Sequence, residues 1–403
     1  MKMLAIARFS CALALVLNST FSWAESIDIT AVFTPDPRNP GNTEFINTTP
    51  STGHCLNIAC AAGRHSLAPK IKTLPADIKA NAADLRQSAL FKMPTEIKNV
   101  TIVSADGQTQ QLGFQIVGAG ARLQFNKSVG AISGGGHADI WVGGSWLYAG
   151  AGGCSGTGYS RLSTTFYSFF WGVGPPANCG RISRFDLEDF RYENFTFIYQ
   201  LITPNPLSMK SGVYRGQLDL SVGPGGDLDF GDVMLPDDDR LTLNFILEVS
   251  HVLQVAFPAG SQHLALVPQG GWQQWLERGR RPEKLSAVQN FSLWSSMPFK
   301  MLLQCQYSVG NQCALENEVG HQVAVDTRVT LPPGFSTYMA GGPVKDLPLS
   351  SSTPTVIDVT QYMDNARGSL DFAIDRDGVE KMIVHAGSRY KGDVTVIWDG
   401  DIP

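Results

Sequence analysis

The sequence predicts an all-β protein built from β-sandwiches, on three observations. Apolar residues alternate with a period of two in many segments, most clearly from Leu241 to Phe257, where every odd position except His251 is apolar. A strand with one buried face alternates in this way, whereas a helix needs apolar spacings of three and four. The 41 Gly and 23 Pro form about 16 % of the chain, above the usual ~12 %, which indicates many turns. Helical patterns, finally, are few.

The expected strands follow one another along the chain with turn residues between them. The run from Leu241 to Phe257 is far longer than the usual strand of about 5–6 residues, so it is either two strands around a bend near Ser250 or one long edge strand. Helices are expected at 76–88, 272–279 and 376–385. Other short strands are expected at Ile27–Phe33, Val100–Val103, Gly113–Val117, Gln217–Val222, His263–Val267, Phe299–Gln304, Val323–Leu331 and Val394–Trp398.

Composition and charge exclude several classes of protein. With 43 % hydrophobic and 17 % charged residues, the chain is neither disordered nor a coiled coil. Its 36 Asp and Glu outnumber 31 Lys and Arg, so nothing indicates nucleic acid as a partner.

The first 24 residues are typical of a secretory signal peptide. Lys2 and Arg8 are their only charged residues, an apolar stretch runs from Phe9 to Leu17, and Ser22-Trp23-Ala24 is a small-x-small cleavage site. The mature chain is therefore expected to begin near Glu25 and to be exported.

The cysteines support an exported protein. Cys11 lies in the signal peptide, and the other six form three local pairs, so we expect the disulfides Cys55–Cys60, Cys154–Cys179 and Cys305–Cys313. A zinc site is the competing interpretation, but the chain has no CxxC motif and its histidines do not cluster near the cysteines. No metal and no cofactor are expected.

Catalytic motifs are missing from the sequence. It contains no HExxH, P-loop or nucleophile elbow, and no carboxylate pair suited to a glycosidase. Asp227, Asp229 and Asp232 resemble half of a calcium site, but a solvated hairpin tip explains them better. The sequence therefore predicts a protein that is not an enzyme.

The stretch from Gly134 to Trp171 is rich in glycine and aromatic residues. Glycine lets a backbone approach a ligand closely, and a Trp or Tyr ring can stack on the apolar face of a sugar. Trp141, Trp146, Tyr159 and Arg161 are the candidate receptor-binding residues, whereas Trp171 is expected in the core. The alternative is that most of these aromatic residues fill the core.

The C-terminal end resembles a known family. Tyr390-Lys-Gly392-Asp-Val394-Thr-Val396-Ile-Trp398 is similar to the closing strand of fimbrial subunits assembled by the chaperone–usher route. Leu264–Val267, with the following Pro268-Gln-Gly-Gly271, resembles the first strand of such a pilin domain, and Phe299–Cys305 a middle one. A domain that ends in the long strand precedes this pilin-like part. The chain as a whole therefore resembles the two-domain tip adhesins of the colonisation-factor (alpha) fimbriae.

The resemblance implies two domains after the signal peptide at 1–24. Residues 25–259 would form an elongated β-sandwich adhesin domain, and residues 260–403 an immunoglobulin-like pilin domain that lacks its seventh strand. The competing boundary is Thr203–Pro206. In the incomplete domain, Val394, Val396 and Trp398 would line the groove that a donor strand fills.

The resemblance also implies function, partners and location. The chain would be a fimbrial tip adhesin that binds a host or surface glycan and is anchored by donor-strand complementation. A periplasmic pilus chaperone, an outer-membrane usher and the major pilin subunit would be its partners, and export through the periplasm would bring it to the fimbrial tip at the cell surface. In that family, a cluster of arginines that contacts the receptor follows the strand that matches Gln217–Val222. This chain has Gly223-Pro-Gly-Gly-Asp227 at that place, so the resemblance does not assign receptor-binding arginines to it.

Two alternatives remain open at this point. The chain could be a structural or initiator minor pilin without receptor binding, in which Glu25–Phe33 donates a strand to a neighbour instead of forming the first strand of the adhesin domain. It could also be a secreted carbohydrate-active protein.

Overall fold

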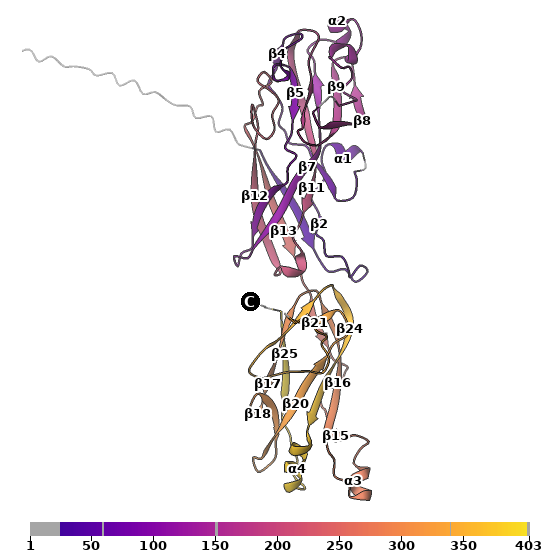
Figure 1. The fold of residues 1–403 in the computed structure, drawn as a ribbon, viewed down its shortest axis with the longest axis vertical. Helices are drawn as coiled ribbons and strands as arrows, with labels where there is room; N and C mark the ends of the chain where they lie inside the picture. Colours follow the sequence, from indigo (N-terminus) through magenta and orange to yellow (C-terminus); the bar gives the residue numbers. More distant parts are fainter. Residues whose placement is uncertain (1–24, 59, 150–151, 339, 401–403) are drawn as a thin grey trace, which may run out of the picture.

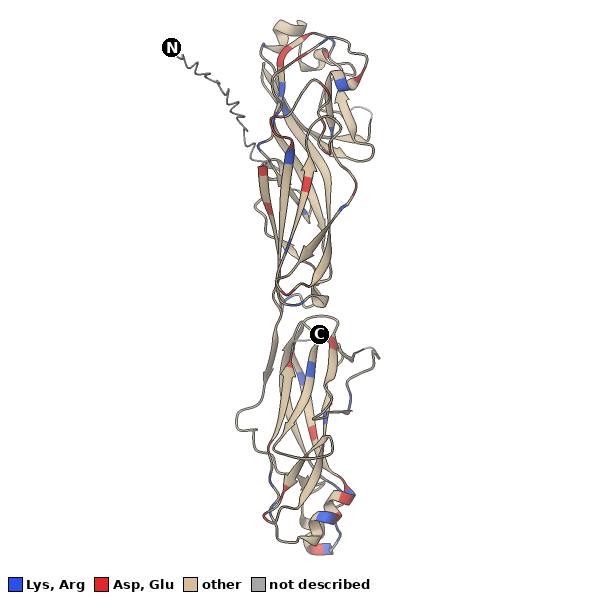
Figure 2. Ribbon diagram, turned by 90° about the vertical axis from the view of Figure 1, so that its left-hand side faces the viewer, with Lys and Arg blue, Asp and Glu red and all other residues tan. Residues whose placement is uncertain are grey.

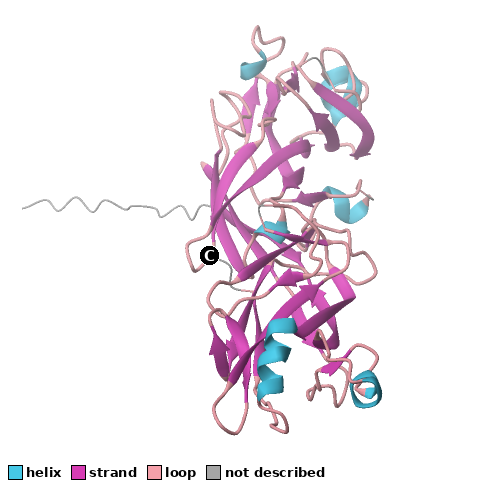
Figure 3. Cartoon of the chain, turned by 60° about the horizontal axis from the view of Figure 1, so that its bottom comes forward, coloured by secondary structure: helices cyan, strands magenta, loops and turns pink. Residues whose placement is uncertain are grey.

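The computed structural model describes residues 25–400 apart from 59, 150–151 and 339, so the expected signal peptide lies outside the described residues. Strands dominate the fold, and the helices are short and lie at its periphery (Figure 3). The buried side chains form two separate hydrophobic cores, one within residues 29–249 and the other within 285–379. The predicted all-β class, with two sandwich-like bodies, is confirmed; Figure 1 shows them end to end.

The N-terminal body has long strands and short connecting helices. Its helical segments are α1 (His54–Asn57), α2 (Val129–Ser133), η1 (Leu85–Gln87), η2 (His137–Ile140) and η3 (Pro206–Ser208). Its strands are β1 (Glu25–Phe33), β2 (Ile46–Asn47), β3 (Arg64–Leu67), β4 (Ala76–Ile78), β5 (Ala89–Lys92), β6 (Lys98–Val103), β7 (Thr109–Gln124), β8 (Cys154–Leu162), β9 (Phe166–Val173), β10 (Asn178–Arg181), β11 (Leu187–Ile202), β12 (Gly212–Ser221) and β13 (Arg240–Val249).

One large sheet organises this body, with the strand order β2-β1-β13-β12-β6-β7-β11-β3. Strand β9 pairs with the C-terminal half of β7 and carries β8 at its other edge. Alternation along β13 places Leu241, Leu243, Phe245 and Leu247 in the core, as the sequence predicted. Each such side chain contributes about 1.5–3 kcal/mol when it leaves water.

Strand β1 belongs to this sheet. It runs parallel to β13, from the pair Glu25 and Leu241 to the pair Phe33 and Val249, and it also pairs with β2. Ile29 and Phe33 are buried in the N-terminal core. Residues 25–33 therefore form a strand of the N-terminal body and not a free donor arm.

The C-terminal body is a smaller sandwich of two sheets. One has the order β14-β16-β24-β20-β19-β18 and the other β21-β23-β17-β25. Its elements are β14 (Leu253–Ala256), β15 (Val267–Pro268), α3 (Gln273–Arg278), β16 (Leu285–Ser295), β17 (Phe299–Cys305), β18 (Tyr307–Val309), β19 (Gln312–Glu316), β20 (Gln322–Thr330), β21 (Phe335–Thr337), β22 (Leu347–Pro348), β23 (Thr355–Val359), β24 (Met363–Ile374), α4 (Arg376–Val384) and β25 (Val394–Asp399).

The long alternating run is two strands that belong to different bodies. β13 ends at Val249, and β14, which begins at Leu253, pairs with β16 of the C-terminal body. The expected division between residues 259 and 260 is therefore corrected to the segment 250–252. The apolar alternation resumes directly after His251 and so does not show that the chain changes sheets there. Between the two strands, the His251 ring contacts the Met209 carbonyl through Nε2 (2.9 Å) and the Ser296 hydroxyl through Nδ1 (3.1 Å).

Two expected elements differ in the structure. The helix expected at 76–88 is instead strand β4, a turn at Asn81 with a positive φ of 53°, and the short η1 segment. Aspartate and asparagine side chains favour turns over helix interiors, and here they outweigh the alanines. The strand expected at 263–267 is confined to β15. The two other expected helices are present as α3 and α4, at the lower end of the C-terminal body, where Figure 2 shows several charged residues.

Basic side chains of the chain itself form ion pairs with Asp227, Asp229 and Asp232. The expectation of a solvated hairpin tip is wrong for Asp229, because its side chain is fully buried. The Arg86 guanidinium contacts Asp229 at 2.8 Å and Asp232 at 2.6 Å, and Lys98 contacts Asp227 at 2.8 Å. Burial alone would raise the pKa of Asp229, but hydrogen bonds from Arg86, Gly231 and Gly225 outweigh it and lower that pKa.

Replacing Arg86 by alanine is expected to lower the free energy of unfolding by about 2–3 kcal/mol, because Asp229 would remain buried without its counter-charge. In the parent, a lowered carboxyl pKa stabilises the fold above the unfolded pKa near 4, and this contribution is lost as the pH falls through the folded pKa. Chemical denaturation at pH 7 and pH 3 measures both effects. Arg38→Ala, which removes an exposed pair with Asp36, is the control and should change stability by less than about 0.5 kcal/mol. An equal loss in both variants would contradict the expectation.

No helix in the described part of the chain is long and apolar enough to span a membrane.

Candidate functional site

A cleft of about 650 Å³ opens on the outer face of the N-terminal sheet, where β8, β9, β7 and β11 lie next to one another. The segment between β3 and β4 and the N-terminal end of α1 complete its walls. The volume lies within the range of small-ligand sites in proteins.

Strand register places polar side chains in one row across the cleft. Arg161 of β8 lies opposite Ser168 of β9, Ser168 lies opposite Arg122 of β7, and Arg122 lies opposite Glu193 of β11. Paired residues of adjacent strands point to the same face of a sheet, so these four side chains share the outer face. The neighbouring positions, such as Phe169 and Leu123, point into the core.

An aromatic stack lies beside this row. Gly118 and Gly120 of β7 leave room for the Phe170 ring, because a Cβ at either glycine would lie 2.8 Å from an atom of that ring. The His54 ring stacks on Phe170 with 3.7 Å between ring centroids and a tilt of 15°, and the Tyr159 ring meets His54 edge-on at 5.0 Å. Phe170 is itself buried, so the rings of His54 and Tyr159 give the cleft the apolar surface on which the face of a sugar ring could stack.

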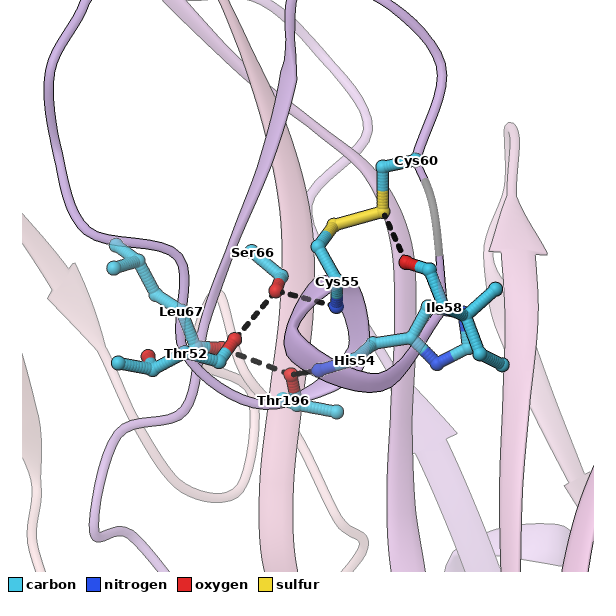
Figure 4. The surroundings of a disulfide bond; sticks show 8 residues. All are labelled: Thr52, His54, Cys55, Ile58, Cys60, Ser66, Leu67 and Thr196. Carbon is cyan, nitrogen blue, oxygen red and sulfur yellow. Dashed lines mark hydrogen bonds between the residues drawn. A yellow bond between two sulfur atoms is a disulfide. The ribbon is translucent and has the colours of Figure 1, made fainter.

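A short disulfide-closed loop holds His54 in this position (Figure 4). Gly53 has a φ of +73°, and a Cβ there would lie 2.3 Å from the Thr196 hydroxyl, so glycine is required by both conformation and space. The His54 N–H donates to that hydroxyl at 3.3 Å, and the Cys55 N–H donates to the Ser66 hydroxyl at 2.8 Å. The Cys55–Cys60 disulfide closes the turn directly after His54.

Replacing both Cys55 and Cys60 by serine is expected to weaken ligand binding by about 3- to 10-fold while the melting temperature changes by less than about 2 °C. The loop spans few residues at the surface, so its loosening is a local opening and not global unfolding. Binding and melting curves of the same preparations separate the two effects. The double change Cys305→Ser and Cys313→Ser, in the other body, serves as the control and should leave binding unchanged. A large loss of melting temperature would mean instead that this loop supports the core.

Basic side chains outnumber acidic ones in the cleft. Lys70, Lys72, Arg122 and Arg161 line it, and Glu193 is the acidic residue among its described lining. The Glu193 carboxylate is bound by Arg191 at 2.6 Å. Burial lowers the pKa of His54, so its ring is neutral at neutral pH and stacks as an uncharged aromatic group.

Of the receptor residues expected from the sequence, the structure brings two to the cleft and buries two. Tyr159 and Arg161 line the cleft. Trp141 and Trp146 are only 0 % and 1 % exposed, so the expectation that they contact a receptor is wrong. Their rings lie 5.3 Å apart in the N-terminal core, where Trp146 also stacks on Trp171.

Sequence reasoning missed His54, Arg122, Lys70 and Lys72, which also line the cleft. They come from segments far from Gly134–Trp171 in the chain and meet it only through strand pairing. The short Cys55–Cys60 spacing was the available signal, because a small disulfide loop holds its neighbours rigidly.

The expected groove residues lie on the last strand of the C-terminal body. Val394, Val396 and Trp398 point to one face of β25 and are half-buried against the C-terminal core. β25 pairs with β17 along one edge, and in the described part of the chain no strand pairs with its other edge.

The three disulfides of the structure join the same cysteine pairs that the sequence suggested.

Within the described residues, no group of three or more His, Cys, Asp or Glu side chains is arranged to hold a metal ion.

No protein-family model and no curated protein matches the chain. Among solved structures, it is similar to the adhesive subunit of the CFA/I fimbria of enterotoxigenic Escherichia coli, with a TM-score of 0.28, 11 % identity, and coverage of 94 % of this chain and 95 % of that one. It is also similar to the tip adhesion subunit of the archaic chaperone–usher Csu pili of Acinetobacter baumannii, solved in a pre-assembly complex with its chaperone (TM-score 0.20, 11 % identity, 93 % and 97 % coverage). A third similar structure is a tip adhesin from Pseudomonas aeruginosa (TM-score 0.24, 8 % identity, 84 % and 86 % coverage). These are proteins of the class that the C-terminal motif resembles, and at such TM-scores the likeness assigns no ligand or residue to this chain.

Proposed function

We propose that the chain is the adhesive tip subunit of a chaperone–usher fimbria. Its N-terminal body binds a surface glycan in the cleft, and its C-terminal body is anchored by a strand donated from another protein. A periplasmic chaperone donates that strand first, and a fimbrial subunit replaces it during assembly at the outer-membrane usher. Three disulfides fit a protein that passes through an oxidising compartment such as the periplasm.

The observation that carries this proposal is the open side of the C-terminal sandwich. Met301 on β17 is completely buried, whereas Val396 and Trp398 on the neighbouring edge strand β25 are only half-buried. Near the end of β25, a Cβ at Gly400 would lie 3.5 Å from the Leu253 side chain of β14, and the Phe291 ring of β16 lies 5.1 Å from the Trp398 ring. An added strand beside β25 would pair its free edge and cover these apolar side chains.

The cleft supports the receptor-binding part of the proposal. It combines a rigid aromatic surface with long polar side chains, which is the composition expected where a protein stacks on and hydrogen-bonds to a sugar. The cleft belongs to the body that is remote from α3 and α4, as Figure 1 shows, so it stays exposed when the C-terminal body is anchored.

Binding of the mature chain, co-produced with its chaperone, to a glycan array tests this proposal. Tyr159→Ala is expected to weaken binding by about 1–3 kcal/mol, or roughly 5- to 150-fold, because it removes an aromatic anchor. Tyr148→Ala is the control, since Tyr148 is 68 % exposed and lies outside the cleft. Failure of the parent to bind any glycan would contradict receptor binding, and equal binding by all three proteins would place the site elsewhere.

A further inference from the structure

The cleft concentrates positive charge on a chain that is acidic as a whole. Lys70, Lys72, Arg122 and Arg161 line it, while acidic residues outnumber basic ones by 36 to 31 over the chain. Within the described residues, no charged side-chain nitrogen of these four residues lies within 4.0 Å of a carboxylate oxygen. Elsewhere, comparable cations such as Arg86 and Lys98 are each paired with two carboxylates. Carboxylates bind the backbone N–H groups of Lys70 and Lys72, so the two arginines are the cations of the cleft whose charge is least compensated by the protein.

Arg122 is the most constrained of these cations. Its guanidinium carbon lies 4.4 Å from the centre of the Phe166 ring, which holds the group by a cation–π contact. Its Nε atom is buried and has no hydrogen-bond partner. A buried donor without a partner destabilises the structure, and an acceptor supplied by a ligand would recover part of that loss.

Arg161 lies where it can act together with Arg122. The two residues are separated by one strand, with Ser168 opposite both, so their Cα atoms are about 10 Å apart at the usual strand spacing. Both side chains lie on the outer face of the sheet and line the same cleft, with Ser168 between them. This arrangement offers several donors to one group with two or three negatively charged oxygens, which is the geometry that arginine recognises best.

We propose that the ligand of the cleft is an acidic saccharide, whose carboxylate or sulfate group is bound by Arg122 and Arg161 while a sugar ring contacts Tyr159 and His54. This inference rests on the proposed receptor-binding function and specifies its ligand class. A free inorganic anion would leave the aromatic surface unused, and a neutral sugar would leave the Arg122 and Arg161 side chains without an anionic partner. Carboxylated and sulfated sugars share the recognised chemistry.

Titration of the mature chain, in complex with its chaperone, tests the proposal with three probes: 3′-sialyllactose, 3′-sulfated lactose and lactose. We expect at least one acidic probe to bind 10-fold or more tightly than lactose at low salt, and the comparison of the two acidic probes identifies the preferred group. Raising the salt concentration to 0.5 M should reduce this advantage, because exposed charges are screened.

Variants separate charge recognition from general damage to the cleft. Arg161→Ala should remove most of the advantage of the acidic probe over lactose, and Arg161→Lys should restore part of it. Arg122→Ala should have the same effect, but its partial burial makes Arg161→Ala the decisive variant. Arg215→Ala is the matched control, since Arg215 is exposed on β12 of the same body and does not line the cleft.

The outcomes are distinguishable. If lactose binds as tightly as both acidic probes and Tyr159→Ala weakens all three, the cleft is a neutral-sugar site, so this inference fails and the proposed function stands. If an acidic probe binds more tightly but Arg161→Ala and Arg215→Ala behave alike, its anion is bound elsewhere and the inference is overturned. If the parent binds none of these probes and no glycan on the array, receptor binding itself fails.

Discussion

Trp146→Ala is expected to lower the free energy of unfolding of the N-terminal body by about 3–5 kcal/mol, the usual cost of deleting a buried aromatic side chain. The Trp146 ring is 1 % exposed and lies parallel to Trp171, with 4.9 Å between centroids and a tilt of 7°. It also contacts Phe169 at 4.6 Å and Trp141 at 5.3 Å. Removing it would leave a cavity among rigid rings that cannot easily move to fill it.

Chemical denaturation followed by tryptophan fluorescence measures this loss. Tyr148→Ala, two residues away and exposed, is the matched control and should change stability by less than about 0.5 kcal/mol. The Trp146→Ala protein that remains folded should still bind its ligand, because the Trp146 ring is buried and does not line the cleft. A Trp146→Ala protein with parental stability and lost binding would support the opposite assignment, in which this ring contacts the receptor.

The error over Trp141 and Trp146 has a physical cause. Glycine and aromatic residues are common both in ligand sites and in sandwich cores where strands approach closely. Composition alone therefore cannot distinguish a ligand site from a core. Gly118 and Gly120 show this ambiguity, since they admit the Phe170 ring to the outer face of β7, while the alternate residues Ala119 and Ala121 are buried in the core. Only strand register decides which side of the sheet each ring occupies.

Local patterns could be predicted well, because they depend on neighbouring residues. Alternation identified the strand that became β13, short cysteine spacings identified the disulfide pairs, and a glycine at position 279 marks the end of α3 with a φ of +65°. The cleft could not be predicted, because Arg122, Arg161 and His54 come together only through the pairing of β7, β9 and β8 and the closure of the Cys55–Cys60 loop. The junction at residues 250–252 could not be predicted for the same reason. The apolar alternation resumes after His251, although the chain passes there from the sheet of β13 to the sheet of β14.

The second large effect is expected in the C-terminal body. Without a donated strand, the mature chain should aggregate or be recovered in low yield, because the free edge of β25 and the apolar side chains beside it can pair with other chains. Co-production with its periplasmic chaperone should instead give a soluble one-to-one complex. A mature chain that is monomeric and melts cooperatively without any partner would contradict the donor-strand part of the proposal.

Two single changes on β25 locate the site of this complementation. Val396 points toward the core and is half-buried, whereas Thr395 next to it points outward and is exposed. Val396→Asp should reduce the recovered chaperone complex 10-fold or more, because the donated strand would bury a carboxylate with no counter-charge at a cost of several kcal/mol. Thr395→Asp places the same charge one residue away on the solvent side and should leave recovery within about 2-fold of the parent.

Pull-down of the complex from periplasmic extracts, normalised to the total amount of the chain, measures the recovery of both variants. A parallel loss for the two variants would show that strand donation does not depend on this face of β25. Loss for Val396→Asp alone, with glycan binding retained by the surviving fraction, would mean that anchoring and receptor binding reside in separate bodies of the chain.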